Sequence, residues 1–179
     1  PLITRLSSLY NFYSFQHRWR VLPPFWRVEM QNQRNTVSSA GAEIMSQQFD
    51  GNSVFPRGEK NEAYAKYFTG DSYLTMLSME GVVIGNVAFE PGCRNFWHIH
   101  HQGGQILLVT GGRGWYQAWN QPARELKTGD VVHIPAGMKH WHGAARDSWF
   151  AHIAVEIPAA GASNEWLEPV SDTEYNLLP

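Results

Sequence analysis

The sequence predicts an all-β domain built as a sandwich or a barrel, and three observations carry this prediction. Short apolar runs follow one another between Gly81 and Ile157 at intervals of about 8 to 12 residues. Glycine and proline separate these runs, for example at Pro91-Gly92 and at Gly129. No helical periodicity interrupts the series. Regular short strands of this kind are typical of sandwiches and barrels, jelly rolls among them.

The chain divides into three zones. Residues 1–50 have weak periodicity and include a polar stretch, so we expect an extension or linker with little order. Residues 51–170 form the predicted barrel domain, and residues 171–179 form a short tail. Residues 1–35 hold five arginines against a single acid, so an organelle-targeting leader is the alternative interpretation of this region.

Local patterns predict several elements within and around the barrel. Residues 55–58 (Phe-Pro-Arg-Gly) are typical of a turn, residues 61–67 of a short helix, and residues 72–79 of a strand. The glycine-rich run 111–114 is typical of a hairpin turn, because no helix follows it. Residues 163–169 are expected to form a short helix or a flap.

Composition and charge exclude some classes of function. The 179 residues carry a formal net charge of -2 and no basic stripe, which argues against nucleic-acid binding. No apolar run approaches the ~18 residues of a membrane span. Cys93 is the single cysteine, so no intrachain disulfide can form. We therefore expect a cytoplasmic protein without nucleic-acid or membrane partners.

Seven of the eight histidines lie between His98 and His152. Side chains two residues apart share one face of a strand, so His98 and His100 point the same way, as do His140 and His142. If both pairs face the barrel interior, four imidazoles meet in one volume. An apolar interior does not tolerate so many polar rings unless something binds them, and a metal ion meets that need.

Two segments resemble the two sequence motifs of the cupin family. The first has its glycines, its H-x-H pair and its carboxylate position at Gly92, His98, His100, Gln105 and Gly112. The second runs from Gly129 through Pro135 and Gly137 to His140. Gln105 stands where the family usually has Glu, and Ala144 replaces the final Asn of the second motif. The resemblance covers about residues 52–170 and implies a single cupin barrel.

A closer resemblance is to small single-domain cupins related to the bacterial manganese-dependent hydroxynitrile lyases and to cupins associated with carboxymuconolactone decarboxylases. It implies that His98, His100, Gln105 and His140 bind one metal ion. It also implies acid–base chemistry at His152. Gln105 has a second interpretation, in which it only orients a neighbouring histidine.

The remaining polar and aromatic candidates carry weaker expectations. His142 is either a catalytic acid/base or a support for its neighbours, and His133 is expected in the core or at the rim. His17 and His101 are expected to face solvent. Trp141 is the best candidate among the tryptophans for a pocket wall, although it should point away from the histidines beside it.

Three imidazoles and one amide leave the +2 charge of a divalent ion uncompensated, which makes a strong Lewis acid. The hard amide oxygen of Gln105 and the resemblance favour manganese, with iron, nickel, cobalt and zinc as alternatives. We expect an enzyme that acts on a small oxygenated molecule, with the metal polarising an oxygen while His152, helped by His142, moves a proton. Hydroxynitrile lyase or related C–C lyase chemistry fits this combination of a metal ion and acid–base histidines.

Other functions stay open. An oxygenase is disfavoured because Gln105 removes the usual carboxylate ligand. A non-catalytic barrel that retains a small ligand, and a structural partner of a decarboxylase-like protein, remain alternatives. We also expect a homodimer that pairs edge strands, with residues 72–79 as the strand involved.

Overall fold

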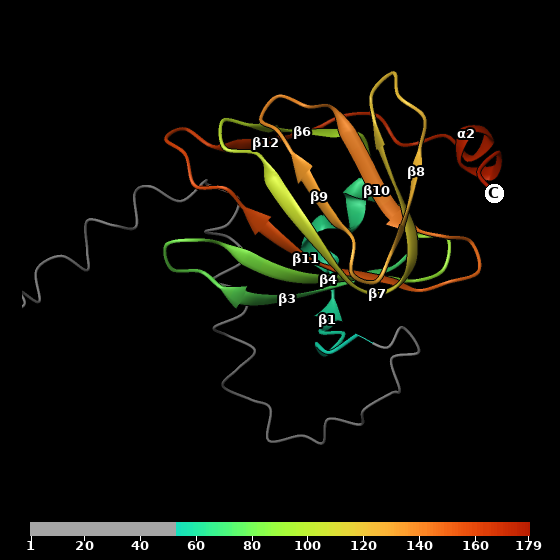
Figure 1. Ribbon diagram of the computed structural model, residues 1–179, viewed down its shortest axis with the longest axis horizontal. Coiled ribbons are helices and arrows are strands. Elements are labelled where there is room, and N and C mark those ends of the chain that lie inside the picture. The colour runs from blue at the N-terminus through green and yellow to red at the C-terminus, as the bar shows by residue number, and fades with distance from the viewer. Residues whose placement is uncertain (1–52) are drawn as a thin grey trace, which may run out of the picture.

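The structure is a computed structural model that describes residues 53–179. The extension expected over residues 1–50, its leader alternative and His17 therefore lie outside the described residues. In the described part of the chain, twelve strands form one curled antiparallel sheet (Figure 1). The strands are β1 (Glu59–Lys60), β2 (Phe68–Thr69), β3 (Ser72–Ser78), β4 (Ile84–Phe89), β5 (Arg94–Asn95), β6 (His98–His101), β7 (Gln105–Ala118), β8 (Arg124–Lys127), β9 (Val131–Ile134), β10 (His140–Ala144), β11 (Phe150–Glu156) and β12 (Ser163–Trp166). The predicted all-β barrel is confirmed.

Within residues 53–179, two short helices flank the strands. The 3-10 helix η3 (Glu62–Tyr67) lies where the sequence predicts a short helix. Helix α2 (Asp172–Asn176) begins after Ser171, whose hydroxyl accepts a hydrogen bond from the backbone N–H of Glu174 at 3.2 Å. That bond satisfies one of the free N–H groups of the first turn. Neither helix has the length or the apolar character needed to cross a bilayer.

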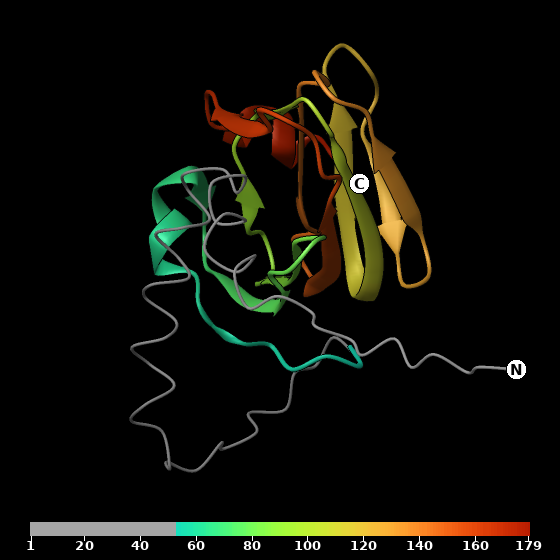
Figure 2. The ribbon, with the colours of Figure 1, turned by 90° about the vertical axis from the view of Figure 1, so that its left-hand side faces the viewer.

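The sheet curls into two facing walls, and Figure 2 shows the fold from the side. The first wall contains β1, β3, β4, β11 and β9, and the second contains β2, β5, β10, β6, β12 and β8. Strand β7 belongs to both, because its first half pairs with β11 and β9 and its second half with β10 and β8. The interior between the walls therefore receives alternate side chains from strands that are far apart in sequence.

The glycine-rich run 111–114 is not the predicted hairpin turn, since β7 continues through it. Pairing with β11 ends at Gly112 and pairing with β10 begins at Gly114, so the strand changes walls here. Gly112 has a φ of +70°, and a Cβ built on it would overlap the carbonyl oxygen of Trp149. A Cβ on Gly114 would lie 2.5 Å from Cγ of Phe150. The glycines are needed for close approach of two strands, a role that has no local signature.

The segment 163–169 also differs from its prediction, because residues 163–166 form strand β12 rather than a helix or flap. Strand β12 pairs with β6 in a register that sets Asn164 opposite His100 and Trp166 opposite His98. The edge of β6 thereby gains a partner for its backbone groups. Strand β3, in contrast, lies close to its prediction and pairs with β4 and, over two residues, with β1. A homodimer formed through β3 stays a prediction.

Two apolar clusters hold the walls in place. The first fills the interior with buried side chains that include Phe89, Leu107 and Phe150. The second lies on the outer side of β10, where residues 167–178, here called the C-terminal strap, cover Trp141 and Trp115. Strand β10 is consequently buried on both faces.

Polar contacts fasten the C-terminal strap to β5 and β10. The buried guanidinium of Arg94 donates to Asp172 at 2.5 Å and to the carbonyl of Val170 at 3.1 Å. The hydroxyl of Tyr175 donates to the carbonyl of Ala144 at 2.6 Å. The strap therefore fixes the two strands that carry Asn95 and His142.

Candidate metal centre

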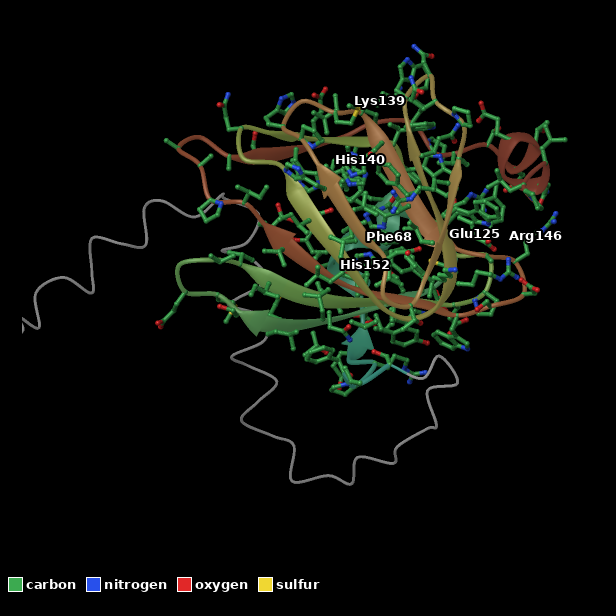
Figure 3. The ribbon with its side chains drawn as sticks, in the orientation of Figure 1. Phe68, Glu125, Lys139, His140, Arg146 and His152 are labelled. Carbon is green, nitrogen blue, oxygen red and sulfur yellow. The ribbon has the colours of Figure 1, made fainter. Side chains whose placement is uncertain are left out.

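Three histidines from two strands converge inside the barrel. His98 and His100 lie on β6, and His140 on β10 stands directly opposite His98 in the strand ladder. All three side chains are buried, and one nitrogen of each lies within 4.8 Å of the others. Figure 3 shows His140 pointing into the space between the walls, whereas Glu125 and Arg146 lie outside it. These rings, here called the histidine triad, could hold a metal ion.

Backbone carbonyls orient two rings of the triad. Nδ1 of His98 lies 2.9 Å from the carbonyl oxygen of Phe96, and Nδ1 of His140 lies 2.9 Å from that of Met138. A carbonyl only accepts, so each Nδ1 carries the proton and each Nε2 keeps its lone pair. Nε2 of His140 is buried without a hydrogen-bond partner among the described residues. A buried lone pair left in this way fits a metal ligand.

Gln105, the first residue of β7, completes the set of polar groups around the triad. Its Nε2 donates to Oε1 of Glu156 at 2.6 Å. Its Oε1 is buried and has no hydrogen-bond partner among the residues described. Oε2 of Glu156 also lies 3.2 Å from Nδ1 of His100. Gln105 therefore has a free oxygen, and its amide nitrogen is held by a carboxylate.

Burial keeps two rings of the triad uncharged. It lowers the pKa of His98 well below the ordinary 6.5, and the neighbouring imidazoles of His140 and His100 lower it further. Burial, followed by the repulsion of His100, lowers the pKa of His140 to about 3. Neutral imidazole is the form that binds metals, so His98 and His140 are ready to accept a cation at neutral pH.

A second pair of histidines lies beside the triad. Nε2 of His152 on β11 lies 3.3 Å from Nδ1 of His142 on β10. Asn95 on β5 contacts His142 twice: its Oδ1 accepts the backbone N–H at 2.9 Å, and its Nδ2 lies 3.0 Å from Nε2 of the ring and 3.4 Å from Nδ1. We call His142 and His152 the histidine pair.

The amide of Asn95 sets the tautomer of the pair. Its oxygen is already used by the backbone of His142, so the group facing the ring is the donating NH2. The nearer ring nitrogen, Nε2, then accepts, and Nδ1 carries the proton toward His152. Burial lowers the pKa of both rings, to about 3 for His152. Both rings are therefore neutral bases at pH 7.

A cavity of about 80 Å³ lies against both groups of histidines. By that measure it holds roughly six water molecules, enough for a small organic molecule. Its polar side is formed by His98, His100, Gln105, Asn95, His142, His152 and Glu156. Its apolar side is formed by Phe68, Leu74, Val87, Phe89, Ala154 and Trp166. Among the described residues no Lys or Arg lines it. Figure 3 shows Phe68 and His152 directed into this interior.

Comparisons with known proteins agree with this architecture. The family model of the cupin domain matches residues 85–155. The (R)-mandelonitrile lyase of Granulicella tundricola is 40% identical over 115 residues, which cover 62% of this chain and 87% of that protein. The chain belongs to the cupin family.

Solved cupin structures show the same fold. A cupin-like protein from Thermotoga maritima is 43% identical, with a TM-score of 0.64, and the match covers 69% of this chain and 94% of that one. A cupin 2 conserved barrel domain protein from Rhodopseudomonas palustris has a TM-score of 0.50 at 17% identity, with coverage of 59% and 71%. At that identity the likeness concerns the fold alone.

Every residue predicted for the site lies in or beside this cavity of the cupin. His98, His100 and His140 form the triad, Gln105 lies next to it, and the histidine pair lies at its side. The structure brings these groups together, and their roles as ligands and as acid–base catalysts remain proposals.

Two expectations about neighbouring residues need correction. Trp141 does not line the cavity, because it packs under the C-terminal strap and donates to Gln117. The tryptophan in the cavity wall is Trp166, whose ring stacks on His98 at 4.7 Å between centroids. His133 is exposed on β9, so of its two expected places the core is wrong. His101 is 44% exposed, as expected for a residue that faces solvent, and pairs with Glu165.

Sequence reasoning missed two polar residues of the site, Asn95 and Glu156. Glu156 could have been found, because strand alternation puts it on the same face of β11 as His152 and Ala154. Asn95 could not, since the chain leaves the strand conformation between β5 and β6 and the alternation is lost.

Proposed function

We propose that this cupin is a metal-dependent lyase that breaks or forms a C–C bond next to a hydroxyl group, with cyanohydrins as substrates. The observation that carries the proposal is the juxtaposition of unpartnered ligand atoms with a neutral histidine pair around one cavity. The resemblance to a protein named (R)-mandelonitrile lyase supports it. His98, His100, Gln105 and His140 are the proposed ligands, and His152 with His142 the proposed acid–base pair.

The proposed ligand set is electrically neutral. Three imidazoles and one amide oxygen carry no charge, so a bound divalent ion supplies a Lewis acid that stabilises negative charge developing on the substrate oxygen. The amide oxygen of Gln105 is a hard donor, and hard donors suit manganese better than copper. We therefore propose Mn(II) as the resident ion.

The histidine pair moves the proton in this mechanism. Nε2 of His152 takes the proton of the substrate hydroxyl, and the C–C bond breaks as its electron pair leaves with cyanide. His152 then returns the proton to cyanide, which gives hydrogen cyanide and a carbonyl compound. The 3.3 Å contact from His142 is long for a hydrogen bond, so a substrate hydroxyl can replace it at Nε2.

The cavity walls support a neutral substrate with an apolar substituent. Glu156 is the charged side chain that lines the cavity, and a second anion would be repelled by it. The rings of Phe68, Phe89 and Trp166 add apolar surface to the same cavity. An arylcarbinol nitrile such as mandelonitrile matches this mixed lining.

The test is cleavage of mandelonitrile by protein loaded with Mn(II), followed through the absorbance of benzaldehyde. Replacing His152 with Ala should lower the rate about 10²- to 10⁴-fold, the range expected for loss of an acid–base group, and should leave metal content unchanged. His133→Ala is the matched control, because it removes an exposed imidazole from the same wall. Full activity in His152→Ala would refute the assigned role.

Two of the alternative functions predict different results in the same preparation. An oxygenase would consume O₂ with bound iron. A non-catalytic barrel would retain a small ligand without turnover. Either result, together with no cleavage of any cyanohydrin, would replace the lyase proposal.

A further inference from the structure

Glu156, the last residue of β11, contacts two of the four proposed ligands. Its side chain is 17% exposed and lines the cavity. Glu156 stands directly opposite Gln105 in the ladder between β11 and β7. Oε1 accepts the amide N–H of Gln105 at 2.6 Å, and Oε2 lies 3.2 Å from Nδ1 of His100.

A mostly buried carboxylate is costly unless a positive charge or several donors compensate it. Among the described residues no Lys or Arg forms an ion pair with Glu156. Its contacts are the amide of Gln105 and the imidazole of His100. A cation held by those two groups would compensate the carboxylate.

The chemistry of a carboxylate also fixes how Gln105 points. It can only accept, so Gln105 must present its nitrogen to Glu156, which leaves Oε1 for a ligand role. Nδ1 of His100 lies 3.2 Å from Oε2 of the same carboxylate but makes no hydrogen bond among the described residues. His98 and His140 have neutral carbonyls beside Nδ1, at Phe96 and Met138, whereas His100 has a carboxylate.

We infer that Glu156 is a positioning residue that holds Gln105 in its metal-binding orientation, beside His100. It also supplies the negative charge that the neutral ligand set lacks, without binding the ion itself. This inference rests on the proposed metal centre. The common cupin motif has its carboxylate at the position of Gln105. In this chain the carboxylate is Glu156, on the paired strand β11.

The test measures the affinity of metal-free protein for Mn(II) by titration calorimetry, in wild type, in Glu156→Leu and in Glu156→Gln. Loss of a partner that orients metal ligands costs about 10- to 100-fold in metal affinity, and we expect that loss in Glu156→Leu, which removes the acceptor of the Gln105 amide. Glu156→Gln keeps one acceptor oxygen and removes only the charge, so its loss should be smaller. The matched control is Glu165→Gln, which removes a carboxylate that lies 2.7 Å from the exposed His101 on the other side of β6. The control should bind Mn(II) as wild type does.

A charge exchange separates positioning from general stability. Gln105→Glu alone sets two carboxylates against each other and should weaken the site. Combined with Glu156→Gln it restores the donor and acceptor, keeps the total charge and moves the carboxylate to the ligand position. The double variant should therefore bind Mn(II) at least as tightly as wild type. A structural role alone would not produce this rescue, and thermal melts of the metal-free variants report stability separately.

Two outcomes overturn the inference. If Glu156→Leu binds Mn(II) within about threefold of wild type, which is below the loss expected for an orienting partner, Glu156 does not position Gln105. If the double variant binds more weakly than Glu156→Gln, the carboxylate does not act through Gln105. Failure of the wild type to bind any first-row divalent ion would instead remove the metal centre itself, and the two failures are thus distinguishable.

Discussion

The side chain of Asn95 holds both the backbone and the ring of His142. Its Oδ1 accepts the backbone N–H at 2.9 Å, and its Nδ2 lies 3.0 Å from Nε2. One amide therefore fixes the position of β10 relative to β5 and the tautomer of the histidine pair. The C-terminal strap holds the neighbouring Arg94, so this contact is supported from the outer face as well.

Replacing Asn95 with Asp should reverse the tautomer of His142. The carboxylate can still accept the backbone N–H, but it now requires a proton on Nε2, which leaves Nδ1 of His142 without one. Nε2 of His152 must then carry a proton to donate to Nδ1 of His142, so it lacks the lone pair that takes the substrate proton, and cleavage should fall at least tenfold. Nitrogen-15 chemical shifts of the two imidazoles report the tautomer directly. Asn120→Asp, in the exposed turn after β7, is the control and should change neither quantity.

The buried histidines should make the metal-free protein sensitive to acid. Burial lowers the pKa of His98, His140, His142 and His152 below the unfolded value of 6.5. Below pH 6.5 the unfolded chain binds protons at these histidines and the folded chain does not. The histidines therefore do not lower the free energy of unfolding above pH 6.5, and they lower it progressively as the pH falls. Each histidine adds a slope of up to about 1.4 kcal/mol per pH unit.

Urea denaturation of metal-free protein at about pH 7 and about pH 5 measures this loss as the difference between the two free energies of unfolding. The decrease should be several kcal/mol, since four such groups contribute together. His133→Ala, which lacks one exposed imidazole, should show the same decrease as wild type. A free energy that does not change over this interval would contradict the neutral, buried state of the rings.

Removing the indole of Trp166 should open the cavity toward solvent. Its ring stacks on His98 and, on the other side, on Tyr67, with 4.7 Å between centroids in both pairs. Each aromatic pair contributes about 0.5–1.5 kcal/mol, so Trp166→Leu should lower the free energy of unfolding by roughly one to three kcal/mol. KM for mandelonitrile should rise while Mn(II) affinity stays the same. An unchanged KM would show that Trp166 does not form a substrate wall.

Gly112 should tolerate no side chain. Gly112→Ala combines a positive φ, which costs about 1–2 kcal/mol, with overlap against the backbone of Trp149, which adds about 1–3 kcal/mol. Gly81 has the same φ of +70° but open space around it, so Gly81→Ala isolates the cost of the conformation. Chemical denaturation of both variants should show the larger loss for Gly112→Ala. Equal losses would contradict the proposed close approach.

Strand periodicity predicted the parts of this site that depend on alternation within one strand. The shared face of His98 and His100, and that of His140 and His142, follow from the two-residue repeat, and the structure has both. The family resemblance added Gln105 and His152. Neither has a histidine two residues away in its own strand, so the two-residue repeat alone did not point to them.

What the sequence did not predict depends on pairing between distant strands. Glu156 meets Gln105 because β11 and β7 align in one register, and no local pattern encodes that register. The run 111–114 resembles a turn, yet its glycines serve an approach to Trp149 and Phe150 that is visible only in three dimensions. Trp166 lies at the cavity because residues 163–166 pair with the edge of β6 as strand β12.

Strand β11 pairs with β4 on one side and with β7 on the other, although it is made long after both. As the ribosome releases this chain, β4 and β7 emerge with the edges that β11 will later occupy still open. Exposed edges of this kind recruit other nascent chains, and the long-range pairing that closes them is slow. Production of the protein should therefore benefit from slow synthesis at low temperature and from chaperones that shield strand edges until the last third of the chain is complete.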